Sequence, residues 1–280
     1  MKKILLIVLV CVLALSMFAC SKEEIESTVS EYTQHNTANV YDANEKNVGT
    51  IKLENIGGEG AELYGYVGIH EEHSIKLDET IGDSGYTVAG IGNSAFLYCT
   101  TLKSITLPDT LTYIDDFAFA GCTNLETITI PASVTYIGKG AFNGCTSLKE
   151  VVFEGGDLEL IDDYAFNGCT ALEKINFPEG LKTIGNFVFN GCSAITSFKA
   201  PSTIKKIGEL AFYDCKGLNV PGAVDFSLAL SIEEIEDIAK FAFSSIDSEN
   251  VIVPEDKNSV AYKFFKTDWE AELGTEEEAK

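Results

Sequence analysis

Apolar residues recur along the chain with a period close to 23 residues, and each period contains the same two patterns. The first, Leu-x-x-Ile-x-Leu from Leu102 to Leu107, alternates apolar and polar residues at its end and predicts a short β-strand. The second is Ala-Phe, or Val-Phe once, shortly after an Asp or Gly, and it predicts a helical turn. Its phenylalanines lie 23, 23, 24, 23, 23 and 31 residues apart: Phe96, Phe119, Phe142, Phe166, Phe189, Phe212 and Phe243.

This fixed period predicts the architecture. A repeat of 20–29 residues with an L-x-x-L-x-L core is the signature of a leucine-rich-repeat solenoid. One repeat alone buries too few side chains to offset its loss of conformational entropy, so repeats must stack. Proline ends several of the predicted strands, because it cannot donate to the ladder: Pro108, Pro131, Pro178 and Pro201. We therefore predict a β-rich α/β repeat protein of about seven coils, with short parallel strands and helical turns.

The repeats divide the chain into five segments. Residues 91–269 should form the solenoid with its C-terminal cap, and residues 48–90 a covering hairpin with a degenerate first coil. Residues 20–47 are polar and suit a tether, whereas residues 270–280 suit a solvated acidic tail. Residues 1–19 have the character of an export signal, considered next.

The first residues carry a targeting signal. Lys2 and Lys3 precede an apolar run from residue 4 to residue 18, which ends at Ala19-Cys20. A basic start, an apolar run of about 15 residues and a small residue at the cut are typical of a cleaved signal peptide. The junction resembles a bacterial lipoprotein cleavage site, which implies that Cys20 becomes the lipidated first residue.

One repeat is longer than the others. Phe212 and Phe243 are separated by 31 residues, and the excess falls within residues 216–231. Insertions in repeats usually emerge as loops on one face, so Phe226 and Leu228 are candidates for an exposed docking loop. In the alternative interpretation, the same residues form a replacement strand and join the core.

The whole repeat resembles a known family. The motif Ile-Gly/Asp-x-x-Ala-Phe-x-x-Cys-Thr-x-Leu-x-x-Ile-x-Leu-Pro is similar to that of BspA-like leucine-rich-repeat proteins of bacterial surfaces, over roughly residues 75–262. The resemblance implies display at the cell surface and protein-binding or adhesive roles. It brings no shared catalytic or ligand residues, and fold by itself names no ligand.

The charge narrows the range of partners. Without residues 1–19 the chain keeps 18 lysines against 43 acidic residues, a net charge of −25. Such a polyanion repels nucleic acid and anionic lipid head groups. Nucleic acid is therefore excluded as a partner, and membrane contact is expected only through the lipid anchor.

Cysteine and histidine are the candidate metal ligands. Six cysteines occupy one position of the repeat: Cys99, Cys122, Cys145, Cys169, Cys192 and Cys215. They could form disulfides between coils or a ladder of buried thiols. Because they lack C-x-x-C spacing, a zinc site is not expected. His70 and His73 form the one histidine pair, in a turn-like context. We expect no cofactor, no metal and no enzymatic activity, because no nucleophile elbow or phosphate-binding loop is present.

Two surface columns follow from aligning the repeats. Lys103, Glu126, Lys149 and Glu173 fall at one strand position and predict ion pairs between strands. Tyr113 and Tyr136 share a second position, whose column ends at Lys206, and the column beside it ends at two further lysines, Lys182 and Lys205. This second column is either a contact patch, since tyrosine is enriched at hot spots, or a simple stacked pair of tyrosines.

The sequence thus predicts a surface-tethered module that binds a protein partner from a host or a neighbouring cell. Two alternatives remain open at this point: a carbohydrate-binding surface lipoprotein, and a structural envelope component without a specific ligand.

Overall fold

The computed structural model describes residues 37–42, 44–57, 60–68, 71–80, 86–229, 231–233, 238–239 and 241–268. The predicted signal peptide, Cys20 and the acidic tail lie outside the described residues. The described residues from Ala38 onward form one compact unit, which contains the whole described hydrophobic core.

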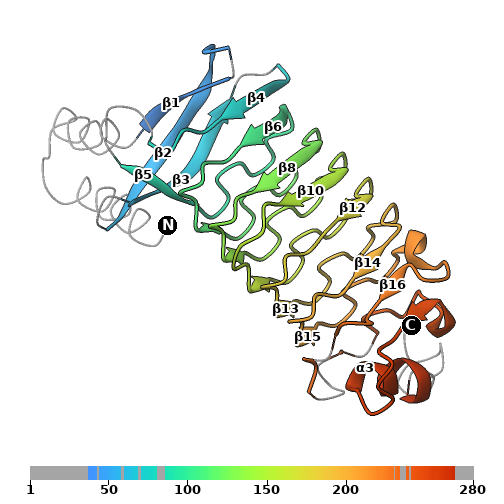
Figure 1. Cartoon of the computed structure of the whole chain (residues 1–280). Helices are drawn as coiled ribbons and strands as arrows, with labels where there is room; N and C mark the ends of the chain where they lie inside the picture. The colour runs from blue at the N-terminus through green and yellow to red at the C-terminus, as the bar shows by residue number, and fades with distance from the viewer. Residues whose placement is uncertain are drawn as a thin grey trace, which may run out of the picture. The chain divides into compact units, whose positions relative to one another are not determined.

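Two parallel ladders of short strands run along this unit (Figure 1). The first ladder is β4 (His73–Lys76), β6 (Leu102–Thr106), β8 (Thr127–Ile130), β10 (Glu150–Phe153) and β12 (Lys174–Ile175). The second is β5 (Thr87–Ile91), β7 (Tyr113–Ile114), β9 (Tyr136–Ile137), β11 (Leu160–Ile161), β13 (Thr183–Ile184) and β15 (Lys206–Ile207). A separate sheet contains β14 (Phe198–Lys199), β16 (Val224–Asp225) and β17 (Val251–Ile252).

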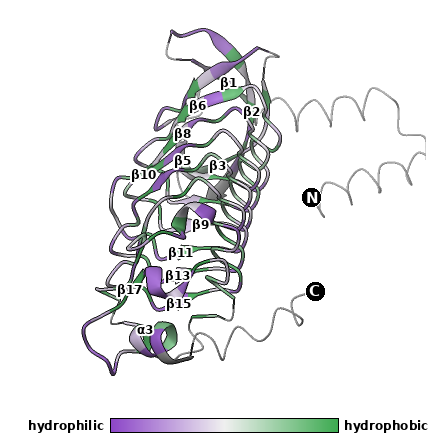
Figure 2. Ribbon diagram, turned by 90° about the vertical axis from the view of Figure 1, so that its right-hand side faces the viewer, coloured by the Kyte–Doolittle hydropathy of each residue, from purple (hydrophilic) through white to green (hydrophobic). Residues whose placement is uncertain are grey.

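Within each ladder, neighbouring strands come from successive repeats, and equivalent positions of the repeat lie side by side. Thr127 lies beside Glu150 in the first ladder, and Tyr113 lies beside Tyr136 in the second. About eight coils result, close to the seven predicted, and the leucine-rich-repeat solenoid is confirmed. Figure 2 shows these coils lying one above another.

The turns that join the ladders differ from the prediction, because they contain little regular helix. In the described residues, helical segments are confined to the C-terminal coils: η2 (Lys216–Leu218), η4 (Ser248–Asn250), α3 (Val260–Lys263) and η5 (Phe264–Asp268). The reason is visible in the coil of Phe119. Phe117 and Gly121 have left-handed φ values of 54° and 72°, which a helix does not tolerate. The backbone N–H of Phe119 therefore donates to Ala141 O in the next coil, at 2.7 Å.

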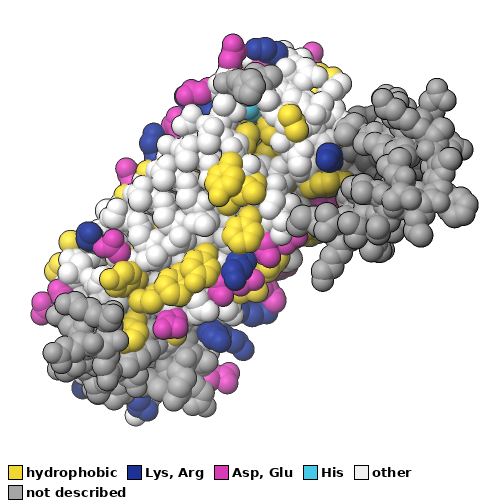
Figure 3. Space-filling model, turned by 180° about the vertical axis from the view of Figure 1, so that it is seen from behind, with side chains coloured by type: hydrophobic (Ala, Val, Ile, Leu, Met, Phe, Trp, Pro, Cys, Tyr) yellow, Lys and Arg dark blue, Asp and Glu magenta, His cyan; other side chains and the backbone are white. Residues whose placement is uncertain are grey.

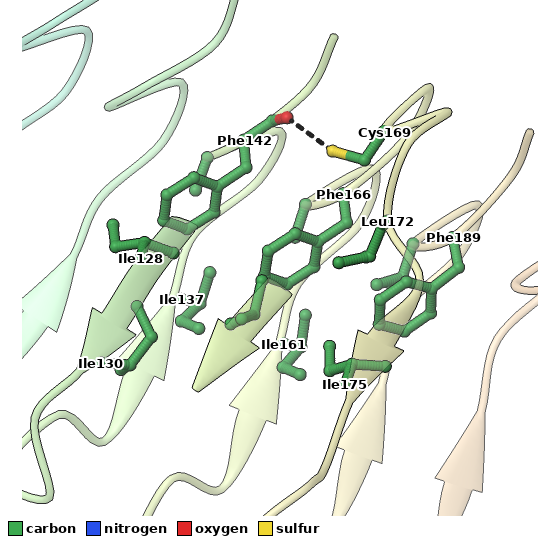
Figure 4. Close-up of a cluster of buried hydrophobic side chains, with 14 of the residues drawn as sticks. Ile128, Ile130, Ile137, Phe142, Ile161, Phe166, Cys169, Leu172, Ile175 and Phe189 are labelled. Atoms are coloured by element: carbon green, nitrogen blue, oxygen red, sulfur yellow. Dashed lines mark hydrogen bonds between the residues drawn. The ribbon is translucent and has the colours of Figure 1, made fainter. Parts of the chain in front are cut away.

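Stacked phenylalanines fill the core (Figure 4). Phe142 lies between Phe119 and Phe166, with ring centroids 5.2 and 5.1 Å away and planes within 4° of parallel. All three side chains are fully buried. The repeated Ala-Phe therefore supplies one ring per coil to a continuous aromatic stack, as the solenoid prediction requires.

Caps close both ends of the core. At the N-terminal end, β2 (Asn47–Gly57) and β3 (Gly60–Gly68) form the predicted hairpin, which connects the two ladders into one sheet of 14 strands. At the C-terminal end, buried Phe265 packs against Phe226 with ring centroids 4.9 Å apart. Terminal coils need such covers because their inner faces have no neighbour.

Two predicted boundaries change. Strand β1 (Thr37–Tyr41) pairs with β4 through Tyr41, so the described end of the predicted tether forms a strand of the sheet. The insertion at 216–231 contributes strand β16, and Phe226 is fully buried within the core. Leu228, in contrast, is 48% exposed. Phe226 therefore joins the core, as the alternative interpretation predicted, although it follows strand β16 and does not lie in it, and the docking-loop interpretation is wrong for this residue.

Candidate binding surface

The two tyrosines of the second ladder are held by carboxylates. The Tyr113 hydroxyl donates to Glu62 Oε2 at 2.7 Å, and the Tyr136 hydroxyl donates to Asp162 Oδ2 at 3.0 Å. Burial, and then the bond to Glu62, raises the pKa of Tyr113, and burial followed by the bond to Asp162 raises that of Tyr136. The Tyr113 ring covers Gly90, where a Cβ would come within 2.1 Å of it. Among the described ring contacts none joins the two tyrosines, so they are not the stacked pair predicted.

The predicted lysines lie apart from these tyrosines. Lys206 pairs in register with Thr183, which is followed by Leu160 and then Tyr136. Three strand steps at about 4.8 Å each separate Lys206 from Tyr136 by roughly 14 Å. Lys182 forms an ion pair with Glu159. Lys205 and Lys206 are both exposed at the far end of the ladder. The structure thus does not bring the predicted tyrosine–lysine patch together.

The predicted charge column of the first ladder is confirmed for three members. Glu126 Oε1 lies 3.4 Å from Lys103 Nζ, and its Oε2 lies 3.1 Å from Lys149 Nζ. The pKa of Glu126 is lowered, first by Lys149 and then by Lys103. Such exposed pairs contribute little to the stability of the fold. A depression lies over them, and its two lysines are balanced by two carboxylates in its lining, those of Glu126 and Glu72.

The repeat cysteines are free thiols, and five of the six are buried. Each of the five donates its S–H to the carbonyl oxygen of the core phenylalanine one coil earlier, at 3.0–3.2 Å. Burial raises the pKa of Cys145 to about 12. The interpretation as a buried thiol ladder is therefore the one that the structure follows.

His73 belongs to the N-terminal cap. Its Nδ1 lies 2.9 Å from Glu71 O, and its Nε2 lies 2.8 Å from the Tyr66 hydroxyl. Both ring nitrogens thus have partners within the protein, whereas His70 lies outside the described residues. Among the described residues no group of three His, Cys, Asp or Glu side chains is arranged to hold a metal ion.

A third surface, on the turns, was not anticipated from the sequence. The residue two positions before each core phenylalanine has a left-handed φ of 52° to 64° in seven coils. Glycine favours this conformation, yet five of the seven coils place large apolar side chains there, Phe241 of the last coil among them. We call the four that come before Phe241 the turn stripe: Phe117, Tyr164, Phe187 and Leu210. All four side chains are half-buried.

Contacts along the turn stripe run from coil to coil. Phe117 leans over Gly140, whose Cβ would lie 2.7 Å from the ring. Tyr164 and Phe187 stack with centroids 4.9 Å apart and planes within 3° of parallel, and Lys139 Nζ lies 5.7 Å from the Tyr164 ring centroid. Figure 3 shows an interrupted band of hydrophobic side chains along the back of the molecule, with acidic side chains along part of its border. Aligning the position before Ala-Phe across the repeats would have revealed this column.

Comparison with known proteins identifies the repeat. The model of the BspA type leucine rich repeat region matches residues 89–219 and 157–270, in six copies. The chain belongs to the BspA-type leucine-rich-repeat family. A search of curated proteins found no match to the sequence.

Several solved structures are similar to this member of the family. A leucine-rich-repeat protein of T. pallidum is 23% identical, with 65% of this chain and 77% of that chain covered and a TM-score of 0.39. A leucine-rich cell surface protein of Faecalibacterium prausnitzii is 24% identical, with 71% and 54% covered and a TM-score of 0.45. The pneumococcal vaccine antigen PcpA is 20% identical, with 78% and 70% covered and a TM-score of 0.42. The match thus spans about half of the F. prausnitzii protein.

In the described ranges, no helix is both long enough and apolar enough to cross a bilayer.

Proposed function

We propose that this protein is a non-enzymatic binding module that recognises a protein partner outside the cell. The observation that carries the proposal is the turn stripe, a column of half-buried apolar side chains that is interrupted at Gly140 and runs over three successive coils from Tyr164 to Leu210. Solenoids use such extended surfaces to bind partners. Aromatic side chains that are partly exposed on a rigid scaffold are the typical anchors of protein interfaces.

The location proposed for this module is the outer face of a bacterial membrane. The basic residues Lys2 and Lys3, the apolar run and Ala19-Cys20 support export followed by lipidation of Cys20. One lipidated residue would anchor the mature chain through its buried methylenes. The family match, and a relative described as a leucine-rich cell surface protein, are consistent with this location.

A carbohydrate-binding role has less support. Sugars stack on the open faces of aromatic rings, but Tyr164 and Phe187 turn one face each toward the other. The second face of Tyr164 is approached by Lys139. The single tryptophan, Trp269, lies outside the described residues. A structural envelope role without a ligand leaves unexplained why strained positions carry large apolar side chains.

The test is a binding screen with the compact unit of residues 38–280. Immobilised host matrix proteins and surface proteins of neighbouring bacteria are presented beside a panel of glycans. The expected result is saturable binding to at least one protein and none to the glycans. Binding to glycans alone would favour the carbohydrate alternative, and binding to neither class would favour the structural one.

The anchor is tested separately. Cys20→Ala should release the protein from the membrane fraction or leave the precursor uncut, whereas Cys99→Ala, which changes a repeat cysteine, should leave fractionation unchanged. Membrane fractionation, detergent partition and the mass of the mature N-terminus check this expectation. Normal processing and membrane association of Cys20→Ala would contradict it.

A further inference from the structure

The turn stripe keeps bulky side chains at a backbone position that glycine fits better. Phe117, Tyr164 and Phe187 have φ values of 54°, 60° and 55°, whereas Gly140 occupies the same position at 60° without a side chain. The coil therefore closes equally well when no side chain is present. Bulky residues in sparsely populated backbone conformations cluster at functional sites, where the strain is part of the function. That function is not core packing, which the fully buried phenylalanine two residues later provides.

One border of the turn stripe carries more acidic than basic residues, although Lys139 holds the equivalent place before Gly140. Asp116, Asp163 and Glu209 directly precede three members of the stripe. Asp116 Oδ1 accepts the backbone N–H of Lys139 at 2.7 Å, and Asp163 Oδ1 accepts that of Asn186 at 2.7 Å. These bonds between coils hold the carboxylates in place without removing their charge. In the described part of the chain, no ion pair neutralises either aspartate.

Three neutral residues follow the core phenylalanines of three successive coils, Asn143, Asn167 and Asn190, and the next coil has the exposed Tyr213 at this position. Asn190 Nδ2 donates to Asn167 Oδ1 at 2.8 Å, and Asn167 Nδ2 donates to Asn143 Oδ1 at 2.9 Å, so these amides form a ladder. The glycines that follow these asparagines add no side chain to the surface, and a Cβ built at Gly144 would have no atom within 4 Å. Beside these three coils a partner can therefore approach the stripe without a steric barrier.

We infer that the turn stripe is the docking site for a partner-protein segment whose apolar side chains are flanked by lysine or arginine. The inference rests on the proposed protein-binding function and names the chemistry of the partner. Apolar side chains of the segment would cover the exposed edges of Tyr164, Phe187 and Leu210. Its basic side chains would face the acidic border, where charge complementarity orients the encounter and raises its rate. An amphipathic basic helix fits this pattern, because its pitch of about 5.4 Å is close to the coil spacing of about 4.8 Å.

The experiment uses the compact unit 38–280 and a short synthetic helix of leucine and lysine, with leucines at i, i+3 and i+4 spacing. Two control peptides have the same leucine and lysine residues in scrambled order, or glutamate in place of lysine. Binding is measured by fluorescence anisotropy at physiological salt, where charge attraction between exposed groups is screened. We expect the amphipathic basic helix to bind more tightly than both controls. Equal binding of the scrambled peptide, or no binding of the amphipathic one, overturns the inference but leaves the protein-binding screen unaffected.

Variants then locate the site. Tyr164→Gly and Phe187→Gly remove the side chains and suit the left-handed backbone, so the melting temperature should stay within a few degrees of the parent while affinity falls about tenfold. Asp116→Asn with Asp163→Asn keeps the oxygen that accepts the backbone N–H and should also weaken binding. The matched control, Glu154→Gln with Glu173→Gln, removes two exposed charges near the first ladder and should not. Unchanged affinity in the glycine variants, or loss of affinity only together with a large fall in melting temperature, contradicts the docking role.

Discussion

The thiol of Cys169 donates a hydrogen bond to the carbonyl oxygen of Phe142, one coil earlier in the solenoid, with Sγ and O 3.2 Å apart (Figure 4). The ring of the same phenylalanine lies in the aromatic stack. The phenylalanine position thus joins neighbouring coils twice, by ring packing and by the hydrogen bond that its carbonyl accepts from the cysteine. A small apolar residue with a weak donor suits a place that is fully buried but needs one hydrogen bond.

Cys169→Ala should therefore destabilise the compact unit. The substitution removes the donor and leaves the Phe142 carbonyl without this bond, and it also leaves a small gap. The expected loss in free energy of unfolding is about 1–3 kcal/mol. Urea unfolding followed by circular dichroism measures it, with the exposed Thr129→Ala as the control. A midpoint for Cys169→Ala that equals the control would show that the thiol bond contributes nothing.

Phe142→Ala tests the aromatic stack. The ring is fully buried between two others, so its removal opens a cavity that rigid neighbouring coils cannot fill. We expect a cost of about 3–5 kcal/mol. Phe142→Leu, which keeps most of the volume, should cost less than Phe142→Ala. Equal melting temperatures for the parent and the alanine variant would contradict the stacked-coil core.

Because of the buried thiols and the two tyrosines, the free energy of unfolding should decrease at alkaline pH. Burial raises the pKa of Cys145 to about 12 from an ordinary value of 9.0, and it also raises the pKa values of Tyr113 and Tyr136. The unfolded chain releases these protons at lower pH than the folded chain does. Unfolding in base thus releases protons, so the stabilisation is complete below the unfolded pKa and is lost as the pH rises through the folded pKa.

The expected result is a free energy of unfolding that is constant to about pH 8 and decreases steadily above about pH 9. Urea titrations across this range measure the slope. Cys145→Ala should have a shallower slope than the parent, because one of the contributing groups is absent. A slope that is the same in both proteins would mean that this thiol does not contribute to the pH dependence.

The sequence predicted those features that repeat in every coil, because each copy supports the same interpretation. The period, the strands before proline and the buried Ala-Phe follow directly from apolar spacing, and Phe119 and Phe142 occupy equivalent places. The geometry of the turns could not be predicted in the same way. Around Phe117 every second backbone N–H donates to the following coil, and a local pattern carries no information about such a bond, for example the one of 2.9 Å from Phe117 N to Lys139 O. The partners of Tyr113 were also missed, because Glu62 comes from the irregular hairpin, 51 residues away in the sequence.

One pair of equivalent positions tests how much hydrogen bonds between coils contribute to the free energy of unfolding. The hydroxyl of Thr110 donates to Val88 O in the preceding coil at 2.7 Å. Ser133 lies at the same position one coil later, two residues after the strand-ending proline, and its hydroxyl oxygen is buried. Among the described residues, this oxygen has no hydrogen-bond partner within the protein. A buried hydroxyl without a partner destabilises the folded state, because it loses its bonds to water and gains none.

Opposite outcomes are therefore expected for the same chemical change. Thr110→Ala should cost about 1 kcal/mol or more, since the Val88 carbonyl loses its donor, whereas Ser133→Ala should be neutral or stabilising by up to about 1 kcal/mol. Parallel urea titrations of the two variants and the parent provide the comparison, and each variant serves as the control for the other. If Ser133→Ala were as destabilising as Thr110→Ala, the Ser133 hydroxyl would have to bond to a partner in solution, and the difference between the two coils would disappear.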